Sequence, residues 1–181
     1  MDALTRAALA ARSGDRQALE RFVTETYPEV WRLCAALVNE TAAEDLAQET
    51  FARATRALRR FRGEAAARTW ILAIARRTCM DELRGRYRRR RRDRDLAASI
   101  DREAFSADVA GSVEVHALLD QLDPDRRAAF VLTQVLRLTY DETAIVCDCA
   151  PGTVRSRVAR ARDQLVAAFD EVEVRDRVPQ R

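Results

Sequence analysis

Hydrophobic residues recur at steps of three and four along most of this chain, which is the period of an amphipathic helix. One apolar stripe between residues 43 and 60 consists of Ala47, Phe51, Ala54 and Leu58. A second stripe between residues 151 and 165 consists of Val154, Val158, Ala161 and Leu165. No run shows the alternation of β-branched residues that is typical of strands. The pattern therefore predicts an all-α fold.

Two signals predict helix boundaries in the N-terminal half. Pro28 is expected to interrupt the helix that begins near residue 15, because proline has no amide N–H to donate. Thr41 and Glu44 form a capping-box pattern, in which the threonine side chain accepts from the N–H of residue 44 and the glutamate reaches back. A new helix is therefore expected to open at Thr41.

The apolar stripes fade between residues 92 and 112, where alanine, serine and one glycine occur without a period. We interpret this segment as a flexible linker. It joins two small helical domains, residues 1–91 and 113–172, and residues 173–181 are expected to form a frayed tail.

Residues 138–165 show the pattern of a helix-turn-helix, which is two short helices around a tight turn. Asp148 lies in the expected turn, and aspartate tolerates a left-handed backbone better than most residues. Pro151 suits the first turn of the second helix, where its missing N–H costs nothing. In the first helix, the residues expected to pack inward are Tyr140, Ala144 and Val146.

The second helix of this motif carries arginines beside its apolar stripe, at positions Arg155, Arg157, Arg160 and Arg162. A helix that buries one side and shows arginines on the other, braced by a short partner, suits the major groove of DNA. The alternative is an ordinary amphipathic helix with a solvated arginine face.

Charge is distributed unevenly along the 181 residues, although the formal net charge is only +3. The segment Arg84–Arg94 is densely basic, whereas Thr41–Glu49 is acidic. All 32 basic residues are arginine. A GC-rich genome would explain the absence of lysine, yet arginine still makes the bidentate phosphate and guanine contacts that lysine cannot.

One candidate surface is the acidic face of the helix that carries Phe51. It consists of Asp45, Gln48 and Glu49, which lie opposite the apolar stripe. This face is either a solvated helix surface or a docking surface for a basic partner helix, since opposite charges steer encounter and set register.

The other candidate surface combines aromatic and basic residues. Phe61 and Arg62 precede the helix from Thr69. This helix carries Trp70 and then Arg76, Arg77, Arg84, Arg86 and the run Arg88–Arg92, with Tyr87 among them. Aromatic rings beside a basic track are typical of single-stranded nucleic acid binding, because the rings stack on bases while guanidinium groups follow phosphates. By its period alone, Trp70 fits a core position equally well.

Signatures of catalysis and of metal or cofactor binding are missing from the sequence. There is no glycine-rich phosphate loop, and the single histidine, His116, has no nucleophile at a catalytic spacing. Cys147 and Cys149 lack further ligands for zinc. We therefore expect no enzyme activity, no metal and no cofactor. With no apparent secretory signal and no apolar run of membrane-spanning length, we expect a cytoplasmic protein with its cysteines as thiols.

Three segments together resemble the bacterial extracytoplasmic-function (ECF) sigma factors of RNA polymerase. They are AEDLAQETFARA at residues 43–54, ARTWILAIARRTCMDELR at 67–84 and GTVRSRVARARDQL at 152–165. They occur in the order and at the separations that are typical of this family of two-domain helical initiation factors.

The resemblance implies that the protein binds core RNA polymerase and directs it to promoter DNA, with an anti-sigma factor as a further possible partner. The acidic face of Asp45, Gln48 and Glu49 would dock on the β′ clamp helices, and the β flap is a second expected contact. The N-terminal domain would recognise and help melt the −10 element through Phe61, Arg62, Trp70, Arg76, Arg77 and Arg84. The C-terminal helix would read the −35 element through Thr153, Arg155, Ser156, Arg157 and Arg160.

A different class of protein remains as the alternative, namely a free-standing helix-turn-helix regulator whose N-terminal domain senses a signal or dimerises. Such a regulator binds its operator alone and often as a dimer on a palindrome. A sigma factor is expected to bind promoters well only together with polymerase, so dependence on that partner separates the two hypotheses.

Overall fold

The structure, a computed structural model, describes residues 1–96 and 117–177. Every regular element within these two ranges is helical, in agreement with the predicted all-α fold. The N-terminal unit contains α1 (Ala3–Arg12), α2 (Arg16–Leu37), α3 (Glu40–Leu58) and α4 (Ala67–Leu96). The C-terminal unit contains α6 (Pro124–Phe130), the π-helix η1 (Val131–Val135), α7 (Tyr140–Cys147) and α8 (Pro151–Arg177).

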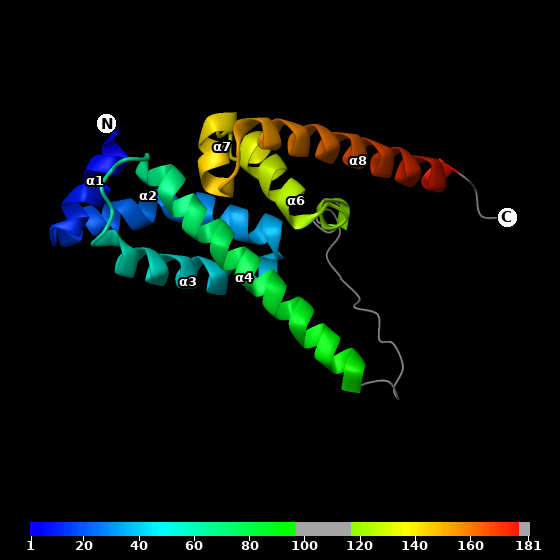
Figure 1. Cartoon of the computed structure of the whole chain (residues 1–181), viewed down its shortest axis with the longest axis horizontal. Helices are drawn as coiled ribbons and strands as arrows, with labels where there is room; N and C mark the ends of the chain where they lie inside the picture. Colours follow the sequence, from blue (N-terminus) through cyan, green and yellow to red (C-terminus); the bar gives the residue numbers. More distant parts are fainter. Residues whose placement is uncertain (97–116, 178–181) are drawn as a thin grey trace.

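In the N-terminal unit, α1, α3 and α4 pack on α2, and the hydrophobic core lies between these helices (Figure 1). Its largest fully buried side chains are Phe22, Leu33 and Leu37 of α2 with Ile71 and Leu72 of α4. Burying one such side chain stabilises the fold by about 1.5–3 kcal/mol. This core therefore fixes α4, which carries the candidate −10 residues, against the rest of the unit.

Two predicted boundaries in this unit are wrong. Pro28 lies inside α2, which continues through it, because Pro28 is exposed while Phe22 and Val30 on either side are buried. The burial of these two side chains thus outweighs the loss of the backbone hydrogen bond that a proline cannot donate. The cap of α3 is Asn39 rather than Thr41, and its Oδ1 accepts from the N–H of Ala42 at 2.9 Å.

In the C-terminal unit, the predicted helix-turn-helix is present. Asp148 ends α7 in the left-handed region with φ of 52°, and Pro151 opens α8. The predicted stripe of α8 is buried at Val154, Val158 and Ala161. Asp123 caps α6 directly before Pro124.

One of the three residues of α7 that were expected to pack inward does not do so. Ala144 and Val146 pack inward as predicted, but Tyr140 is 37% exposed. It is the first residue of α7, where the ring can lie outside the unit under the guanidinium of Arg155.

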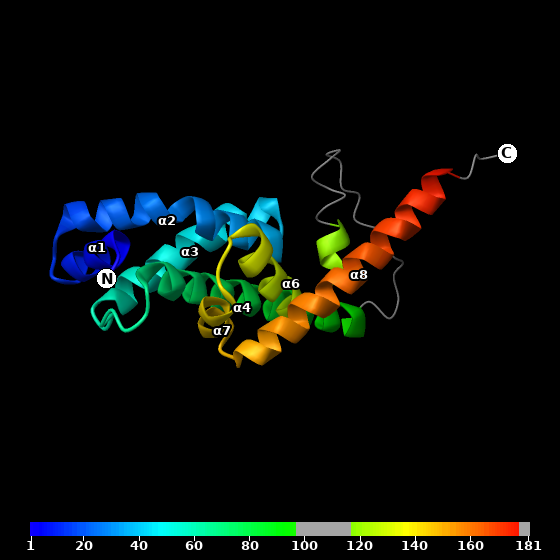
Figure 2. The same ribbon diagram turned by 90° about the horizontal axis from the view of Figure 1, so that it is seen from above.

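The helices extend beyond the expected domain limits of residues 91 and 172. α4 includes the arginine run and continues to Leu96, because arginine is a good helix former and Arg86 pairs with Glu82 one turn earlier. α8 continues to Arg177, and its C-terminal half extends away from the other helices (Figure 2). Residues 97–112 of the expected linker lie outside the described residues.

The two units pack against each other, with α7 on α4 and α6 on the end of α2 (Figures 1 and 2). Val131, Leu132 and Val146 belong to the same buried cluster as the core of the N-terminal unit. Arg127 of α6 donates to the carbonyl of Leu37 at 3.2 Å, so the interface is also tied by a backbone contact.

Candidate polymerase and promoter interfaces

The acidic face of α3 is solvent-exposed at Asp45, Gln48 and Glu49. Arg53 donates to Glu49 and to Asp81 of α4, each at 2.8 Å, which links α3 to α4. The hydrogen bond from Arg53 lowers the pKa of Glu49, so its carboxylate is ionised at neutral pH. The face is therefore rigid and negatively charged, as a docking surface for basic side chains requires.

The recognition helix α8 begins with exposed residues that include Thr153, Arg155, Ser156 and Arg160. α7 supports this helix and is itself fixed at its start by a capping box between Thr139 and Glu142. The hydrogen bonds from Thr139 lower the pKa of Glu142, the backbone N–H contributing most. The helix-turn-helix therefore presents a defined set of polar side chains to solvent.

Arg155 is positioned by an aromatic ring. Its guanidinium lies over the ring of Tyr140, 5.9 Å from the centroid. A cation–π contact of this length restricts where the guanidinium group can point.

Arg157 differs from the other candidate −35 residues, because its side chain is only 23% exposed. It donates to Oδ2 of Asp125 at 2.9 Å. The other oxygen of Asp125 accepts from Arg76 of α4. One carboxylate thus binds an arginine from each of the two candidate DNA surfaces.

The candidate −10 residues divide into exposed and enclosed groups. Arg62, Arg77 and Arg84 are exposed, whereas the side chain of Arg76 is 16% exposed because it reaches Asp125. The ring of Phe61 is buried and lies 4.8 Å from the half-buried ring of Trp70.

The prediction that Phe61 belongs to an exposed aromatic track is therefore wrong. Trp70 also contacts Phe22, with ring centroids 6.2 Å apart, so the three rings form one cluster in the core. The free energy of burying Phe61 favours this arrangement over exposure to solvent.

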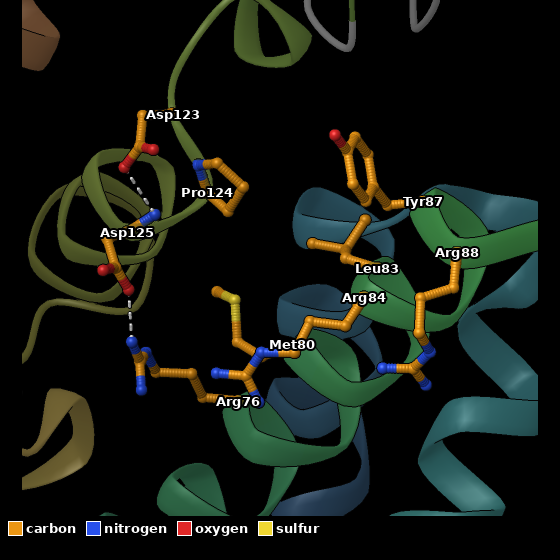
Figure 3. A pocket seen from close by; sticks show the side chains of 9 residues that line it. All are labelled: Arg76, Met80, Leu83, Arg84, Tyr87, Arg88, Asp123, Pro124 and Asp125. Carbon is orange, nitrogen blue, oxygen red and sulfur yellow. Dashed lines mark hydrogen bonds and ion pairs between the residues drawn. The ribbon is translucent and has the colours of Figure 1, made fainter. Parts of the chain in front are cut away.

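An exposed aromatic side chain does occur further along α4, at Tyr87 (Figure 3). It lines a groove of about 620 Å³ between α4 and α6, whose other lining residues are Arg76, Met80, Leu83, Arg84, Arg88, Asp123, Pro124 and Asp125. Of the aromatic residues expected beside the basic track, Tyr87 is thus the one that is exposed.

The described residues contain no cluster of three or more side chains suited to hold a metal ion. The Sγ atoms of Cys34 and Cys79 lie 3.5 Å apart in the core, and the pKa of Cys79 is raised by this contact and by burial. Burial raises the pKa of Cys147 to about 11. None of the helices described is long and apolar enough to span a membrane.

Two family descriptions match the two helical units. Residues 22–91 match Sigma-70 region 2, and residues 112–165 match Sigma-70, region 4. Both matches follow the order of the two units along the chain.

Similar proteins cover nearly the whole chain. A probable RNA polymerase sigma-C factor of Mycobacterium bovis is 44% identical over 168 residues, which is 92% of this chain and 91% of that protein. The RNA polymerase sigma-H factor of Pseudomonas aeruginosa is 36% identical, covering 86% and 88% of the two chains. The ECF RNA polymerase sigma-E factor of Escherichia coli is 32% identical, covering 85% and 87%.

The solved structures that share this fold include two complexes. One is CnrH with the cytosolic domain of CnrY, with a TM-score of 0.74, 25% identity and coverage of 94% of this chain and 99% of that one. The other is the sigma factor RpoE with the anti-sigma factor NepR from Bartonella quintana, with a TM-score of 0.68, 27% identity and coverage of 83% and 96%.

The fold and the two surfaces thus define a two-domain helical transcription initiation factor. The chain belongs to the sigma-70 family and, within it, to the ECF sigma factors. It binds core RNA polymerase and directs it to promoters. This result decides against the free-standing regulator considered above.

Proposed function

We propose that the two units divide promoter recognition between them, without catalytic chemistry of their own. The C-terminal unit reads the −35 element, and the N-terminal unit recognises and melts the −10 element. The observation that carries this proposal is the exposed row of Thr153, Arg155, Ser156 and Arg160 at the start of α8, directly after the left-handed turn at Asp148. The N-terminal residues of a recognition helix are those that reach base edges in the major groove.

The assignment of the −10 element to the N-terminal unit is supported by the exposed arginines of α4 and the preceding loop. Arg62, Arg77 and Arg84 can meet phosphates without rearranging the core. Trp70 is half-buried, so a part of its ring is accessible from outside. Phe61 supports this residue from the core instead of contacting a base itself.

Polymerase binding is assigned to the acidic face of α3. Its exposed carboxylates suit the β′ clamp helices as basic partners, and the β flap is expected to contact the C-terminal unit. The similar structures are complexes with partner proteins, one of them named an anti-sigma factor, so we include an anti-sigma factor among the partners of this chain. The protein acts where the polymerase is, in the cytoplasm.

The test is transcription in vitro by core polymerase with the full chain, on one promoter and on copies substituted in each element. Arg155→Ala should lower initiation about tenfold and reduce discrimination at −35, since a bidentate base contact is worth about 1–3 kcal/mol. Arg84→Ala should instead slow melting around −10 and leave −35 discrimination unchanged. If both variants lose discrimination at the same element, the proposed division is wrong.

A further inference from the structure

Two cysteine side chains meet in the core of the N-terminal unit. Cys34 of α2 and Cys79 of α4 are fully buried, and their Sγ atoms lie 3.5 Å apart. Val30 and Ala75, one turn earlier on the same two helices, are also fully buried, so the pair lies in the interior of the core and not at its edge. Neither thiol has a role in the polymerase-binding or promoter-binding surfaces described above.

The contact between the two sulfur atoms suits a disulfide bond. A disulfide holds its sulfur atoms about 2.05 Å apart, so these two atoms have to approach each other by about 1.5 Å. The thiols come from helices that pack directly on each other, although they are 45 positions apart in the chain. A disulfide would therefore join α2 to α4 covalently where the two helices already touch.

Ordinary core packing is the alternative, because a free cysteine behaves as a small hydrophobic residue. The S–H of Cys79 donates to Cys34, but a thiol is a weak donor and this hydrogen bond adds little to the effect of burial. Two apolar side chains would fill the same space without bringing two sulfur atoms together. The sulfur–sulfur contact is therefore the feature that points to oxidative coupling.

The chain between Cys34 and Cys79 carries both proposed surfaces of the N-terminal unit. It contains the whole of α3 with its acidic face, the loop with Arg62 and the part of α4 that carries Trp70. A disulfide would close this segment into a covalent loop, which lowers the conformational entropy of the unfolded chain. It would therefore stabilise the part of the fold that presents both surfaces.

Both thiols are protected in the folded, reduced chain. The thiolate is the reactive form of cysteine, and the contact with Cys34 together with burial raises the pKa of Cys79. Oxidation therefore requires a transient opening between α2 and α4 that admits a small oxidant. Hydrogen peroxide is small enough to enter, and after the bond has formed the same burial keeps reductants away from it.

We propose that Cys34 and Cys79 are a redox modification site, which hydrogen peroxide converts to a disulfide that joins α2 to α4. In a reducing environment this disulfide is transient and forms during oxidative challenge. It stabilises the N-terminal unit under the conditions that produce it.

The oxidation takes place in two steps. One thiolate attacks an oxygen of the peroxide and breaks the O–O bond, which gives a sulfenic acid and a hydroxide that is protonated to water. The second thiolate attacks the sulfenic sulfur and forms the S–S bond, and the displaced hydroxide also leaves as water. The two thiols supply both protons and two electrons, and one peroxide is reduced to two waters.

The test compares the reduced full chain with the same chain after treatment with hydrogen peroxide and removal of the oxidant. After unfolding, an alkylating reagent should modify all four cysteines of the reduced chain but only two of the oxidised chain, and peptide mapping should find Cys34 joined to Cys79. The oxidised chain should melt on the order of 10 °C higher, because the disulfide closes a long loop. Dithiothreitol added to the unfolded chain should restore the two missing thiols.

Variants of the two units provide the controls. Cys34→Ala removes one partner and should abolish the rise in melting temperature on oxidation. Cys34→Val is a second variant of this kind, which fills more of the space if alanine leaves a destabilising cavity. The matched control is Cys149→Ser, which removes a half-buried thiol from the helix-turn-helix and should leave the disulfide and the stabilisation unchanged.

The proposal is overturned if all the cysteines of the peroxide-treated chain still react with the alkylating reagent, or if the bond is found elsewhere, such as between Cys147 and Cys149. It is also overturned if the chain with Cys34 joined to Cys79 melts no higher than the reduced chain. The unchanged chain supplies both measurements, so misfolding of a variant cannot hide either result.

Discussion

At the scale of single residues, the environment of each arginine determines what it can do. Arg76 and Arg77 are neighbours in sequence, yet the first is enclosed beside Asp125 and the second is exposed. Arg155 and Arg157 differ in the same way on α8, since one lies over Tyr140 and the other reaches Asp125. An arginine in a basic run is therefore not by itself a DNA contact.

The ring of Tyr140 should contribute to −35 recognition through Arg155. Tyr140→Ala removes the surface under the guanidinium, and an exposed cation–π contact is worth about 0.5–1 kcal/mol. We expect polymerase with this variant to bind the promoter two- to fivefold more weakly and to discriminate less at one −35 position. Tyr140→Phe keeps the ring and should behave like the unchanged chain. Equal losses in both variants would assign the effect to the hydroxyl group instead.

At the scale of elements, the short helix α7 depends on its first turn. The backbone N–H of Thr139 donates to Glu142 at 2.8 Å, and the Thr139 hydroxyl accepts from the N–H of Glu142 at 3.2 Å. α7 has only eight residues and is too short to be stable by helix propensity alone. The cap and the buried Ala144 and Val146 hold it in place for α8.

The capping carboxylate should make stability depend on pH. The pKa of Glu142 is lowered in the folded protein, first by the N–H of Thr139 and also by its hydroxyl and the charge of Arg68. Its contribution is therefore present above the unfolded pKa of about 4.3 and is lost as pH falls through the folded pKa. Glu142→Gln should lower the free energy of unfolding by roughly 0.5–1 kcal/mol at pH 7.

Urea denaturation of the two proteins at pH 7 and near pH 3 measures this difference. The gap between them should be present at pH 7 and become smaller as the pH falls through the lowered pKa of Glu142, because the protonated glutamate is then neutral like the glutamine. A gap of the same size at both pH values would show that charge at position 142 does not stabilise the cap.

Elements that are determined by residues close to one another in sequence could be predicted. The buried stripe of α8, the left-handed turn at Asp148 and the start of α6 after Asp123 each depend on residues within a turn or two. The predictions for Pro28 and Thr41 are wrong because packing overrides the local rule at Pro28 and because a second capping residue, Asn39, lies two positions before Thr41.

The candidate site shows the same limit. The exposed acidic face of α3 and the exposed start of α8 follow from helical period, so both could be predicted. The burial of Phe61 on Trp70 and the ion pair of Arg76 with Asp125 depend on contacts between distant segments. The Arg76 pair joins residues 49 positions apart, which no periodicity in the sequence encodes.

At the scale of the whole molecule, the packing of the two units determines which of the proposed surfaces are accessible. The acidic face of α3 is exposed, whereas Arg76 and Arg157 pair with Asp125 where the two units meet. The face proposed to bind polymerase is therefore accessible in this arrangement, and these two arginines are not.

The measurement that tests this account most directly is a footprint of the full chain on a promoter, with and without core polymerase. The account predicts protection over both the −35 and −10 elements only when chain and polymerase are present together, and little protection by the chain alone. Equal protection of the promoter by the chain alone, or none over these elements with polymerase, would contradict it.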